Sequence, residues 1–525
     1  MTVGAAGPAG PGPGDAPAGL TYAELIHAAY RRWGDRTAFV SVTGDRLTYR
    51  ACGALLNRLT RALHARGVRR GSGVAFLSSN RPELSLAVAA VLTLGGRVSL
   101  LPPLVGPERL ARLLELAAVD VLLVDPLLEP LLPALDLPAT VLAVGPSAAL
   151  PDLLAEAGGQ REAAVRILAR PEDLAFVYFT SGSTGPAKAV TATQAASALG
   201  ALLLVANVQW PAEIRFLACT GMAQILQVPI RLRGGCVHLH NGFDPDRARE
   251  TVLAEGITAT YLTPPMLLQL ARRGGPLPSL ESLVYAGNVV PPAHVAEALD
   301  ALGPVLVQAY SQVEVNTWAT ALSREEHRTG PPGSAGRPLP GVDVSVRDEA
   351  GDAVPPGTVG EVCLRGATLT RGYWRDPAAT AAGWRRGWLR TGDGGRLDED
   401  GYLHLLGRRQ DRLAGGLWAR EIEDPVCAHP QVAGAAAVEG EAGELVVTVV
   451  PRPGSRVDEA ELSRAVPERA GPVRFRYAAA LPVASSGKLD RAALRATVLA
   501  GAGAGVGAER AARAGEAGEA TGARR

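Results

Sequence analysis

Residues 174–179 read LAFVYF and are followed directly by TSGSTGPAK at residues 180–188. The six apolar and β-prone residues predict a buried strand that ends where the loop begins. The loop gathers hydroxyl groups, glycines and one lysine, Lys188. Glycines let the backbone approach a ligand closely, amides and hydroxyls donate hydrogen bonds to oxygen atoms, and the lysine adds positive charge. Together these features predict a loop that binds a triphosphate.

Two other interpretations of the loop are weaker. In a Walker loop a glycine precedes the lysine and a hydroxyl residue follows it to bind magnesium, whereas here Ala187 and Ala189 occupy those positions. A Ser- and Gly-rich surface turn is the simpler alternative. The density of donors beside a buried strand favours the phosphate loop.

On both sides of the loop, short β-rich runs alternate with helical stretches. Such alternation predicts an α/β fold, with mostly parallel sheets covered by helices. Pro82–Leu94 is the clearest buried helix. The predicted strands, besides 174–179, are Val74–Ser78, Val121–Val124, Val141–Val144, Ala259–Leu262 and Leu283–Ala286.

The texture of the sequence changes along the chain and predicts its domains. Residues 335–405 carry short β-prone runs with Gly/Pro turns, which predict a small β-barrel-like subdomain within a large N-terminal domain, residues 18–407. The Arg-rich stretch 407–412 introduces a small mobile α+β domain, residues 408–495, with the break expected within Arg408–Arg412. Residues 1–17 and 501–525 are biased in composition and are expected to be disordered tails.

Composition excludes several classes of protein. A chain of 525 residues is too long for one core, so two or more domains are expected. The net charge of +1 gives no reason to expect nucleic acid or an anionic membrane as a partner. The longest apolar stretch, Leu84–Leu101, is interrupted by Gly95, Gly96 and Arg97, which argues against a membrane span. The absence of a signal-like start and of CxxC pairs predicts a cytoplasmic location.

Several further motifs make the sequence resemble the adenylate-forming (AMP-binding) superfamily of acyl- and aryl-CoA ligases, luciferases and peptide-synthetase adenylation domains. The resemblance covers most of residues 20–495, and its motifs follow the family order. After TSGSTGPAK they are YLTPPMLLQL, SLVYAGNVVPP, QAYSQVE, SAGRPLPGV, GEVCLRGATLTRGYW, WLRTGD, GRRQDR, EIE and LPVASSGKLDR. The resemblance implies that ATP and Mg²⁺ serve as cofactors, that a small acid is activated to acyl-AMP, and that pyrophosphate is released.

The resemblance also implies roles for individual residues. Glu314 matches the acid that binds Mg²⁺, together with the Thr184 hydroxyl, and Lys488 matches the catalytic lysine that bridges the acid and the α-phosphate. Asp393 should accept hydrogen bonds from the ribose hydroxyls, reinforced by Arg408. Tyr310 should stack on adenine, with Ser311 beside it and Gly287 and Asn288 lining the other face. The loop residues expected to hold phosphate are Thr180, Ser181, Gly182, Ser183, Thr184, Gly185 and Lys188.

Four departures from the family pattern bear on the substrate. Val313 replaces the usual Thr in QAYSQVE, and Ser311 replaces the usual Gly beside the acyl pocket. Met222 stands near the pocket mouth, where a His or aromatic residue is frequent. The segment after Arg408 is about three residues shorter than in relatives, with Gln410 at the usual hinge position. A small acyl pocket is therefore expected, with Met222, Gln224, Gln227 and Ser311 as its candidate lining residues.

The acceptor of the acyl group stays open. The first interpretation is transfer to CoA or to the phosphopantetheine thiol of an acyl carrier protein. A second is transfer to an amine, or activation of an anion other than a carboxylate. A third is a degenerate protein that binds nucleotide or acyl-AMP without turnover, which the retained Lys188, Glu314, Asp393, Arg408 and Lys488 oppose. A further pair, His238 and His240, is expected to be structural, because no third metal ligand is evident.

Overall fold

The computed structural model describes residues 19–103, 105–138, 140–180, 187–221, 224–441, 443–483 and 489–500. The chain divides into two compact units. The first comprises the described residues of Met1–Asn288 together with Glu297–Thr391 and Gly395–His404. The second comprises Val289–Ala296, Gly392–Gly394 and the described residues from Leu405 onward. The boundary expected within Arg408–Arg412 remains a prediction, and both predicted tails lie outside the described residues.

Two large sheets form the framework of the first unit. Within the described residues one has six strands, ordered β6-β5-β3-β4-β7-β8, and the other has nine, ordered β15-β14-β13-β12-β11-β9-β10-β1-β2. The inner strands run parallel, and antiparallel pairs occur at the edges of the sheets. The six strands are β3 Gly73–Leu77, β4 Arg97–Leu101, β5 Val121–Val124, β6 Thr140–Ala143, β7 Leu174–Phe179 and β8 Ala189–Thr193. The nine are β1 Thr37–Val40, β2 Arg46–Thr48, β9 Arg215–Ala218, β10 Cys236–Leu239, β11 Ala259–Leu262, β12 Ser282–Ala286, β13 Leu306–Tyr310, β14 Thr320–Leu322 and β15 Arg337–Pro338.

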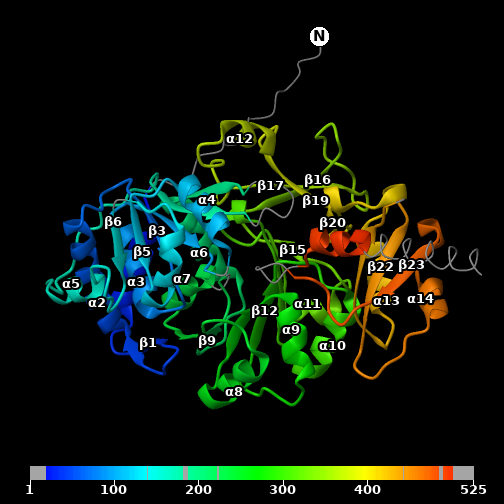
Figure 1. Ribbon diagram of the computed structural model, residues 1–525, viewed down its shortest axis with the longest axis horizontal. Helices are drawn as coiled ribbons and strands as arrows, with labels where there is room; N and C mark the ends of the chain where they lie inside the picture. Colours follow the sequence, from blue (N-terminus) through cyan, green and yellow to red (C-terminus); the bar gives the residue numbers. More distant parts are fainter. Residues whose placement is uncertain are drawn as a thin grey trace, which may run out of the picture. The chain divides into compact units, whose positions relative to one another are not determined.

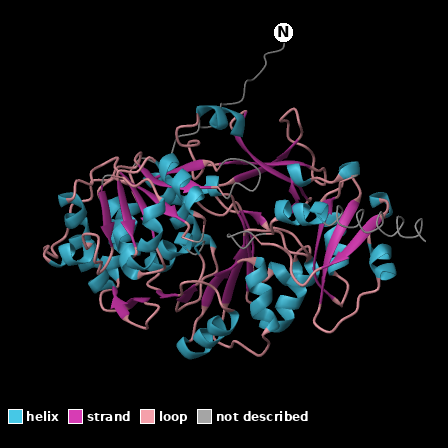
Figure 2. Ribbon diagram, viewed as in Figure 1, coloured by secondary structure: helices cyan, strands magenta, loops and turns pink. Residues whose placement is uncertain are grey.

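A layer of helices fills the space between these two sheets (Figures 1 and 2). One continuous apolar core joins the helices to both sheets, with Phe76 of β3 and Phe216 of β9 among its fully buried side chains. The helices of this layer are α1 Tyr22–Arg32, α2 Tyr49–Ala65, α3 Pro82–Thr93, α6 Gln194–Asn207 and α7 Gln224–Leu232. Other helices of the chain are α4 Pro107–Ala117, α5 Leu153–Gly158, α8 Pro245–Glu255, α9 Pro264–Arg272, α10 Pro292–Leu302, α11 Glu326–Thr329 and α12 Pro377–Gly383.

Local sequence explains where the helices of this layer begin. Thr21 caps α1 through a capping box with Glu24, and Thr48 caps α2 by accepting a hydrogen bond from the amide of Ala51. Helix α3 begins at Pro82, whose fixed φ and missing N–H suit the first helical position. Its mostly buried surface explains the apolar run that could have suggested a membrane span. No helix in the described ranges is long and apolar enough to cross a membrane.

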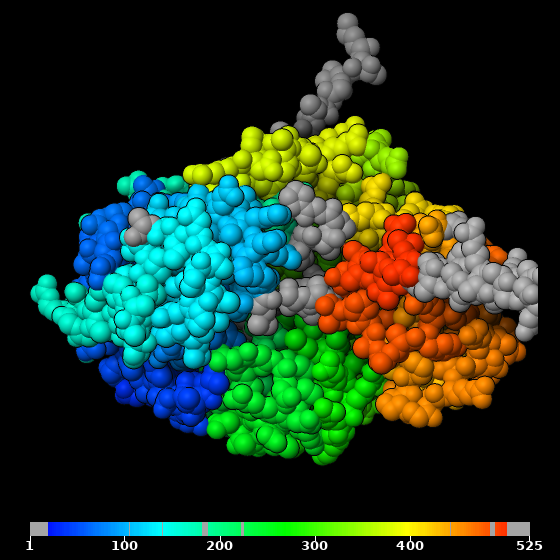
Figure 3. Space-filling view, viewed as in Figure 1, coloured from blue at the N-terminus to red at the C-terminus, as the bar shows by residue number. Residues whose placement is uncertain are grey.

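Segments far apart in sequence meet at the end of the large sheet. Strand β1 lies between β10 and β2, and the Arg46 guanidinium contacts the Glu255 carboxylate at 2.6 Å. The surface shows the same arrangement, with the blue N-terminal part beside the green part of the chain (Figure 3). These contacts fasten the first strands of the chain onto the sheet.

The small β-rich region forms its own sheet. Its order is β16-β17-β19-β18, with β20 paired to β19, and the pairings recorded for the described residues do not close it into a barrel. The predicted β-rich subdomain is therefore present as a five-stranded sheet in this part of the chain, and its barrel-like closure remains a prediction. Its strands are β16 Asp343–Arg347, β17 Gly360–Arg365, β18 Trp384–Arg385, β19 Trp388–Leu397 and β20 Leu403–Arg408, and parts of β19 and β20 belong to the second unit.

The second unit is built on a sheet of the order β21-β22-β23, covered by helices on both faces. Alternate residues of β22 face opposite ways: Val447 packs against α13, and Val446 packs against the helical stretch at residues 491–500. The elements are β21 Val432–Glu439, β22 Leu445–Pro451, β23 Val473–Tyr477, α13 Ala419–Cys427 and α14 Glu459–Ala465. The fold class predicted from the sequence, α/β with helix-covered sheets, is confirmed.

Candidate active site

The predicted phosphate loop lies at the tip of a β-hairpin in the first unit. Strand β7 leads into it and β8 leads out, with Phe179 paired to Ala189. One step further, the Thr180 amide donates to the Lys188 carbonyl at 3.0 Å, and the Lys188 amide donates to the Thr180 hydroxyl at 3.1 Å. The stem of the loop is therefore closed. Ser181, Gly182, Ser183, Thr184 and Gly185 lie outside the described residues.

Lys188, predicted to bind phosphate, and Glu314, predicted to bind metal, both contact a third side chain of the first unit, Tyr373. The Lys188 ammonium nitrogen lies 4.8 Å from the centroid of the Tyr373 ring. The Tyr373 hydroxyl donates to Oε1 of Glu314 at 3.0 Å. Glu314 is 7% exposed, so its carboxylate is held inside the protein and not on an open surface. The hairpin, the tyrosine and the carboxylate thus form one connected group.

Tyr373 was not among the residues predicted for the site. It lies in the motif GEVCLRGATLTRGYW, but nothing in that pattern assigns the tyrosine a contact. Its position follows from pairing between segments far apart in sequence. The Trp374 amide donates to the Ala189 carbonyl at 2.7 Å, and Tyr373 forms an antiparallel bridge with Val190.

The two lysines predicted for the site have a further distinction in the sequence. The chain contains 53 lysines and arginines, and Lys188 and Lys488 are its only lysines. A strong preference for arginine elsewhere makes these two positions informative, because a compact ammonium and a planar guanidinium are not interchangeable at a fitted site. Lys488 itself lies outside the described residues.

The predicted adenine residues follow adjacent parallel strands. Gly287 comes directly after β12, and Tyr310 ends the neighbouring β13, with Ala286 paired to Ala309. The carboxyl ends of parallel strands are where α/β sheets commonly bind ligands. Gly287 has φ of 100°, a conformation that favours glycine, and Tyr310 is 9% exposed. Asn288 follows Gly287 on the surface.

The loop after β13 carries Glu314 and two of the departures from the family pattern. The Ser311 hydroxyl lies within hydrogen-bond distance of the backbone carbonyls of Thr317 and Gln312, so its single donor hydrogen is used within the loop. Val313 begins a short 3₁₀ turn and is 39% exposed. Glu314 also fixes the loop through its backbone, because its carbonyl accepts from the Thr370 amide at 2.7 Å.

The predicted ribose residues form an ion pair in the second unit. The Arg408 Nε lies 3.1 Å from Oδ1 of Asp393, which is 9% exposed. Beside them Gly394 lies against the indole of Trp418: a Cβ on Gly394 would come within 2.0 Å of that ring. Nearby, burial raises the pKa of Asp411, an effect opposed by the charges of Arg491 and Arg408.

Of the residues predicted to line the acyl pocket, only some are described by the structure. Gln227 on α7 is buried at 2% exposure, and its side-chain oxygen accepts hydrogen bonds from Arg231 at 3.1 Å and Ser85 at 3.3 Å. These bonds join it to the next turn of its own helix and to α3. Met222 and the side chain of Gln224 lie outside the description.

Magnesium is the metal that the site residues suit. In the described ranges no group of three His, Cys, Asp or Glu side chains could hold a metal ion. Mg²⁺ usually binds proteins through one or two carboxylates plus substrate phosphates and water, and the buried Glu314 beside the phosphate hairpin fits that pattern. His238 and His240 have ordinary partners instead: His240 Nε2 lies 3.1 Å from the Thr251 hydroxyl, and burial lowers the pKa of His238 to about 4.

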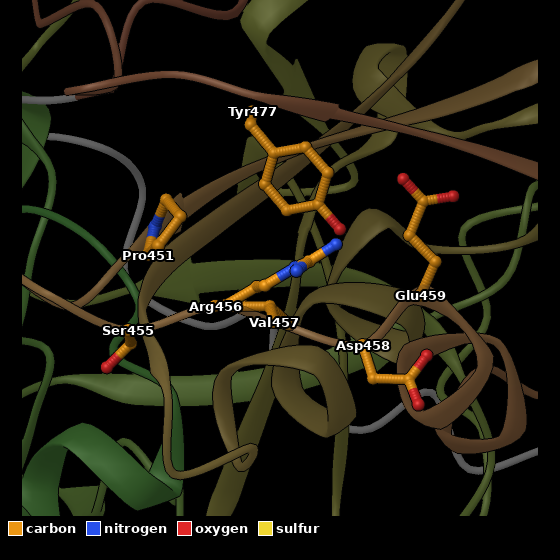
Figure 4. Close-up of a pocket in the computed structure, with 7 residues that line it drawn as sticks. All are labelled: Pro451, Ser455, Arg456, Val457, Asp458, Glu459 and Tyr477. Carbon is orange, nitrogen blue, oxygen red and sulfur yellow. The ribbon is translucent and has the colours of Figure 1, made fainter.

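The second unit carries a cavity of about 730 Å³, and the residues that line it are not those predicted for the active site. Figure 4 shows its lining, which comes from the end of β22, the loop that follows, the start of α14 and the end of β23. It is lined by Pro451, Ser455, Arg456, Val457, Asp458, Glu459 and Tyr477. It contains none of the predicted site residues.

Comparison with known proteins establishes the family. The AMP-binding enzyme family matches residues 26–374. A medium/long-chain-fatty-acid–CoA ligase of Mycobacterium tuberculosis is 32% identical, over 92% of this chain and 91% of its own length. A feruloyl-CoA synthase of Amycolatopsis is 29% identical, over 86% and 94%. The solved structure of the amide bond synthetase McbA from Marinactinospora thermotolerans is 31% identical, with a TM-score of 0.82, over 90% of this chain and 99% of its own. The chain therefore belongs to the AMP-binding enzyme family.

Proposed function

We propose that this protein is an AMP-forming ligase that activates a small carboxylic acid with ATP. A carboxylate oxygen of the acid attacks the α-phosphorus, the bond from that phosphorus to the bridging oxygen of the β-phosphate breaks, and pyrophosphate leaves acyl-AMP behind. The observation that carries the proposal is the group formed by Lys188, Tyr373 and Glu314 beside the phosphate hairpin, in a chain of this family.

The residues act by positioning and by neutralising charge. Donors of residues 180–185 and the Lys188 ammonium hold the β- and γ-phosphates, while Lys488 stabilises charge at the α-phosphate and the acid. Glu314 and the Thr184 hydroxyl would hold Mg²⁺, which when bound neutralises phosphate charge. Charges positioned in this way are commonly the largest single contribution to lowering the activation barrier of such reactions.

The acyl group then passes to a thiol. The thiolate sulfur of CoA, or of a carrier protein's phosphopantetheine, attacks the acyl carbon, and AMP leaves with the electrons of the broken C–O bond. This step is supported by two of the relatives, which are named as a fatty-acid–CoA ligase and a feruloyl-CoA synthase. We place the reaction in the cytoplasm, where ATP and CoA are available, and the scattered cysteines with no CxxC pair agree with a reducing compartment.

An amine is the second candidate acceptor. The 31% identity with an amide bond synthetase over nearly its whole length favours it, as does the shortened segment after Arg408. In that case the amine nitrogen attacks the acyl carbon, loses a proton and forms an amide as AMP leaves.

The acid itself is proposed to be short, planar or polar. Ser311 occupies space where relatives carry glycine, and its hydroxyl is bound within its own loop. Pyrophosphate exchange with a panel of acids from acetate to palmitate tests this directly. Exchange as efficient with palmitate as with the best short acid would contradict it.

The same assay tests the role of Lys488. Replacing Lys488 by Ala should lower pyrophosphate exchange by about 10²–10³, because one positioned charge is removed from the reacting phosphate. ATP binding should stay near the wild-type value, since other residues hold the outer phosphates. Lys488→Arg is the companion variant, because it keeps the positive charge but changes the shape of the charged group. Equal exchange in the Ala variant and the parent would refute the assignment.

A further inference from the structure

Tyr373 joins the lysine of the phosphate hairpin to the carboxylate expected to bind metal, all within the first unit. Its backbone is fixed by strand β8: besides the Val190 bridge, the Thr191 hydroxyl donates to the Gly372 carbonyl at 2.9 Å. The loop that carries Glu314 packs on the same strand. The backbone of Tyr373 is therefore fixed, and its side chain contacts both Lys188 and Glu314.

The two neighbours use different parts of the side chain. The ring face lies 4.8 Å from the Lys188 ammonium, a distance at which the ring quadrupole attracts a cation. The hydroxyl reaches Oε1 of Glu314 at 3.0 Å. The Tyr373 hydroxyl donates this hydrogen bond, and the Glu314 carboxylate accepts it.

We propose that Tyr373 is a positioning residue for Mg·ATP: its ring orients the Lys188 ammonium toward the phosphates, and its hydroxyl fixes the Glu314 carboxylate for the metal. This inference rests on the proposed function. It assigns separate effects to the ring and the hydroxyl. Loss of the hydroxyl should weaken metal binding alone, whereas loss of the ring should weaken metal-free nucleotide binding as well.

The chain offers a matched control. Tyr402 also donates its hydroxyl to a carboxylate, Glu326 Oε1 at 3.2 Å, and its ring also carries a cation, the Arg337 guanidinium at 4.4 Å. It lies in the same unit and outside the predicted site. The substitution Tyr402→Phe therefore removes the same chemical group from a similar pair.

The experiment measures binding, not turnover. The affinity for a fluorescent ATP analogue is measured first in EDTA and then as a function of Mg²⁺ concentration. For Tyr373→Phe we expect half-saturation to need about ten- to hundredfold more Mg²⁺, with metal-free affinity within about twofold of wild type, since one hydrogen bond to a charged group is lost. For Tyr373→Leu we expect metal-free affinity to fall as well, by about three- to tenfold. Tyr402→Phe should change neither quantity.

The scarcity of lysine supplies a second readout. Because Lys188 and Lys488 are the only lysines, an amine-acylating reagent followed by mass spectrometry reports Lys188 separately. Tyr373→Phe should label at the wild-type rate and Tyr373→Leu faster, because only the second variant removes the ring. Tyr402→Phe should again match wild type.

Several outcomes would overturn the inference. They are wild-type Mg²⁺ dependence in Tyr373→Phe, equal loss of metal-free and metal-dependent binding in that variant, and unchanged Lys188 labelling in Tyr373→Leu. A general fall in both affinities together with a lowered Tm would indicate a structural role only. A wild-type protein that binds ATP but exchanges no pyrophosphate with any acid would contradict the proposed function and not this inference. A wild-type protein that binds no nucleotide would remove both.

Discussion

His27 shows, at the scale of one residue, how burial makes stability depend on pH. It lies on α1 at 8% exposure, and its Nε2 lies 3.0 Å from the Thr93 hydroxyl, which itself donates to the Ala89 carbonyl. Burial, and secondarily the charge of Arg31, lowers the pKa of His27 from 6.5 to about 4. The unfolded chain therefore binds this proton more readily between pH 6.5 and 4. Stability from this group is complete above pH 6.5 and is lost as the pH falls toward 4.

We expect the first unit to lose up to about 2 kcal/mol of stability between pH 7 and pH 5 from His27 alone. Urea denaturation at the two pH values measures the loss in wild type and in His27→Gln, where it should be smaller. The exposed histidine His64, replaced in the same way, is the control. A pH dependence unchanged in His27→Gln would contradict the prediction.

Single site residues were predictable only where a motif names them. Glu314 and Asp393 were predicted from family motifs, and the structure places one beside the phosphate hairpin and the other in an ion pair with Arg408. Their roles remain predictions. Tyr373 could not be predicted, because its contacts arise from pairing with a strand about 180 residues earlier. Gln227 was predicted to line the acyl pocket, and this remains a prediction; its side-chain oxygen accepts a hydrogen bond from Arg231.

At the scale of elements, a glycine fixes the distance between helix α6 and the loop that carries Glu314. A Cβ on Gly200 would lie 2.1 Å from the carbonyl oxygen of Asn316, an atom that cannot rotate away. Asn316 itself has φ of 56°, and its side-chain amide donates to the Thr368 carbonyl, so the loop has little freedom to shift. Close approach of helix and loop therefore requires glycine at this position.

We expect Gly200→Ala to destabilise the first unit by about 1–3 kcal/mol, despite the better helix propensity of alanine. Nucleotide binding should weaken too, because the displaced loop carries Glu314. Gly158 on α5 is the matched control, since a Cβ there meets nothing within 4 Å. Thermal unfolding of both variants provides the measurement. Equal Tm values for Gly200→Ala and Gly158→Ala would argue against the close contact.

A second glycine makes a comparable contact in the other unit. The indole of Trp418, just before α13, lies on Gly394, next to Asp393. Gly394→Ala should cost about 1–3 kcal/mol, and much less in a background where Trp418 is replaced by the smaller Leu. A double-mutant cycle on the unfolding of this unit measures the difference. Additive losses would mean that the two side chains do not collide.

The elements themselves were largely readable from the sequence. Strand β3 spans Gly73–Leu77 where Val74–Ser78 was predicted, and α3 spans Pro82–Thr93 where Pro82–Leu94 was predicted. Continuous apolar runs identify such buried parallel strands well. The short strands β1 and β2 were not predicted: β1 joins the sheet by pairing with β10, about 200 residues later, and β2 pairs with β1 at the edge. Strand order is likewise a property of long-range contacts that local patterns do not contain.

At the scale of the whole molecule, we expect the acceptor of the acyl group to depend on the segment after Arg408. The resemblance to the adenylate-forming superfamily implies that this segment moves after adenylation and helps line the path of the thiol. Here it closes on itself within the second unit: Arg412 Nε donates to the Gly416 carbonyl at 2.8 Å, and the Leu413 amide donates to the Leu417 carbonyl at 2.8 Å. Gly415 and Gly416 both have positive φ, which permits the tight turn.

A hinge must tolerate two backbone conformations, and a shortened, self-bonded segment has fewer of them. We therefore expect acyl-AMP to form readily and to be consumed slowly by CoA, so that it accumulates or reacts with a carrier protein or a small amine. Single-turnover kinetics with preformed acyl-AMP measure each acceptor separately. Arg412→Ala, which frees the Gly416 carbonyl, should speed the reaction with CoA more than adenylation. If CoA consumes acyl-AMP as fast as it forms in the wild-type protein, the segment does not limit transfer, and CoA is then the natural acceptor.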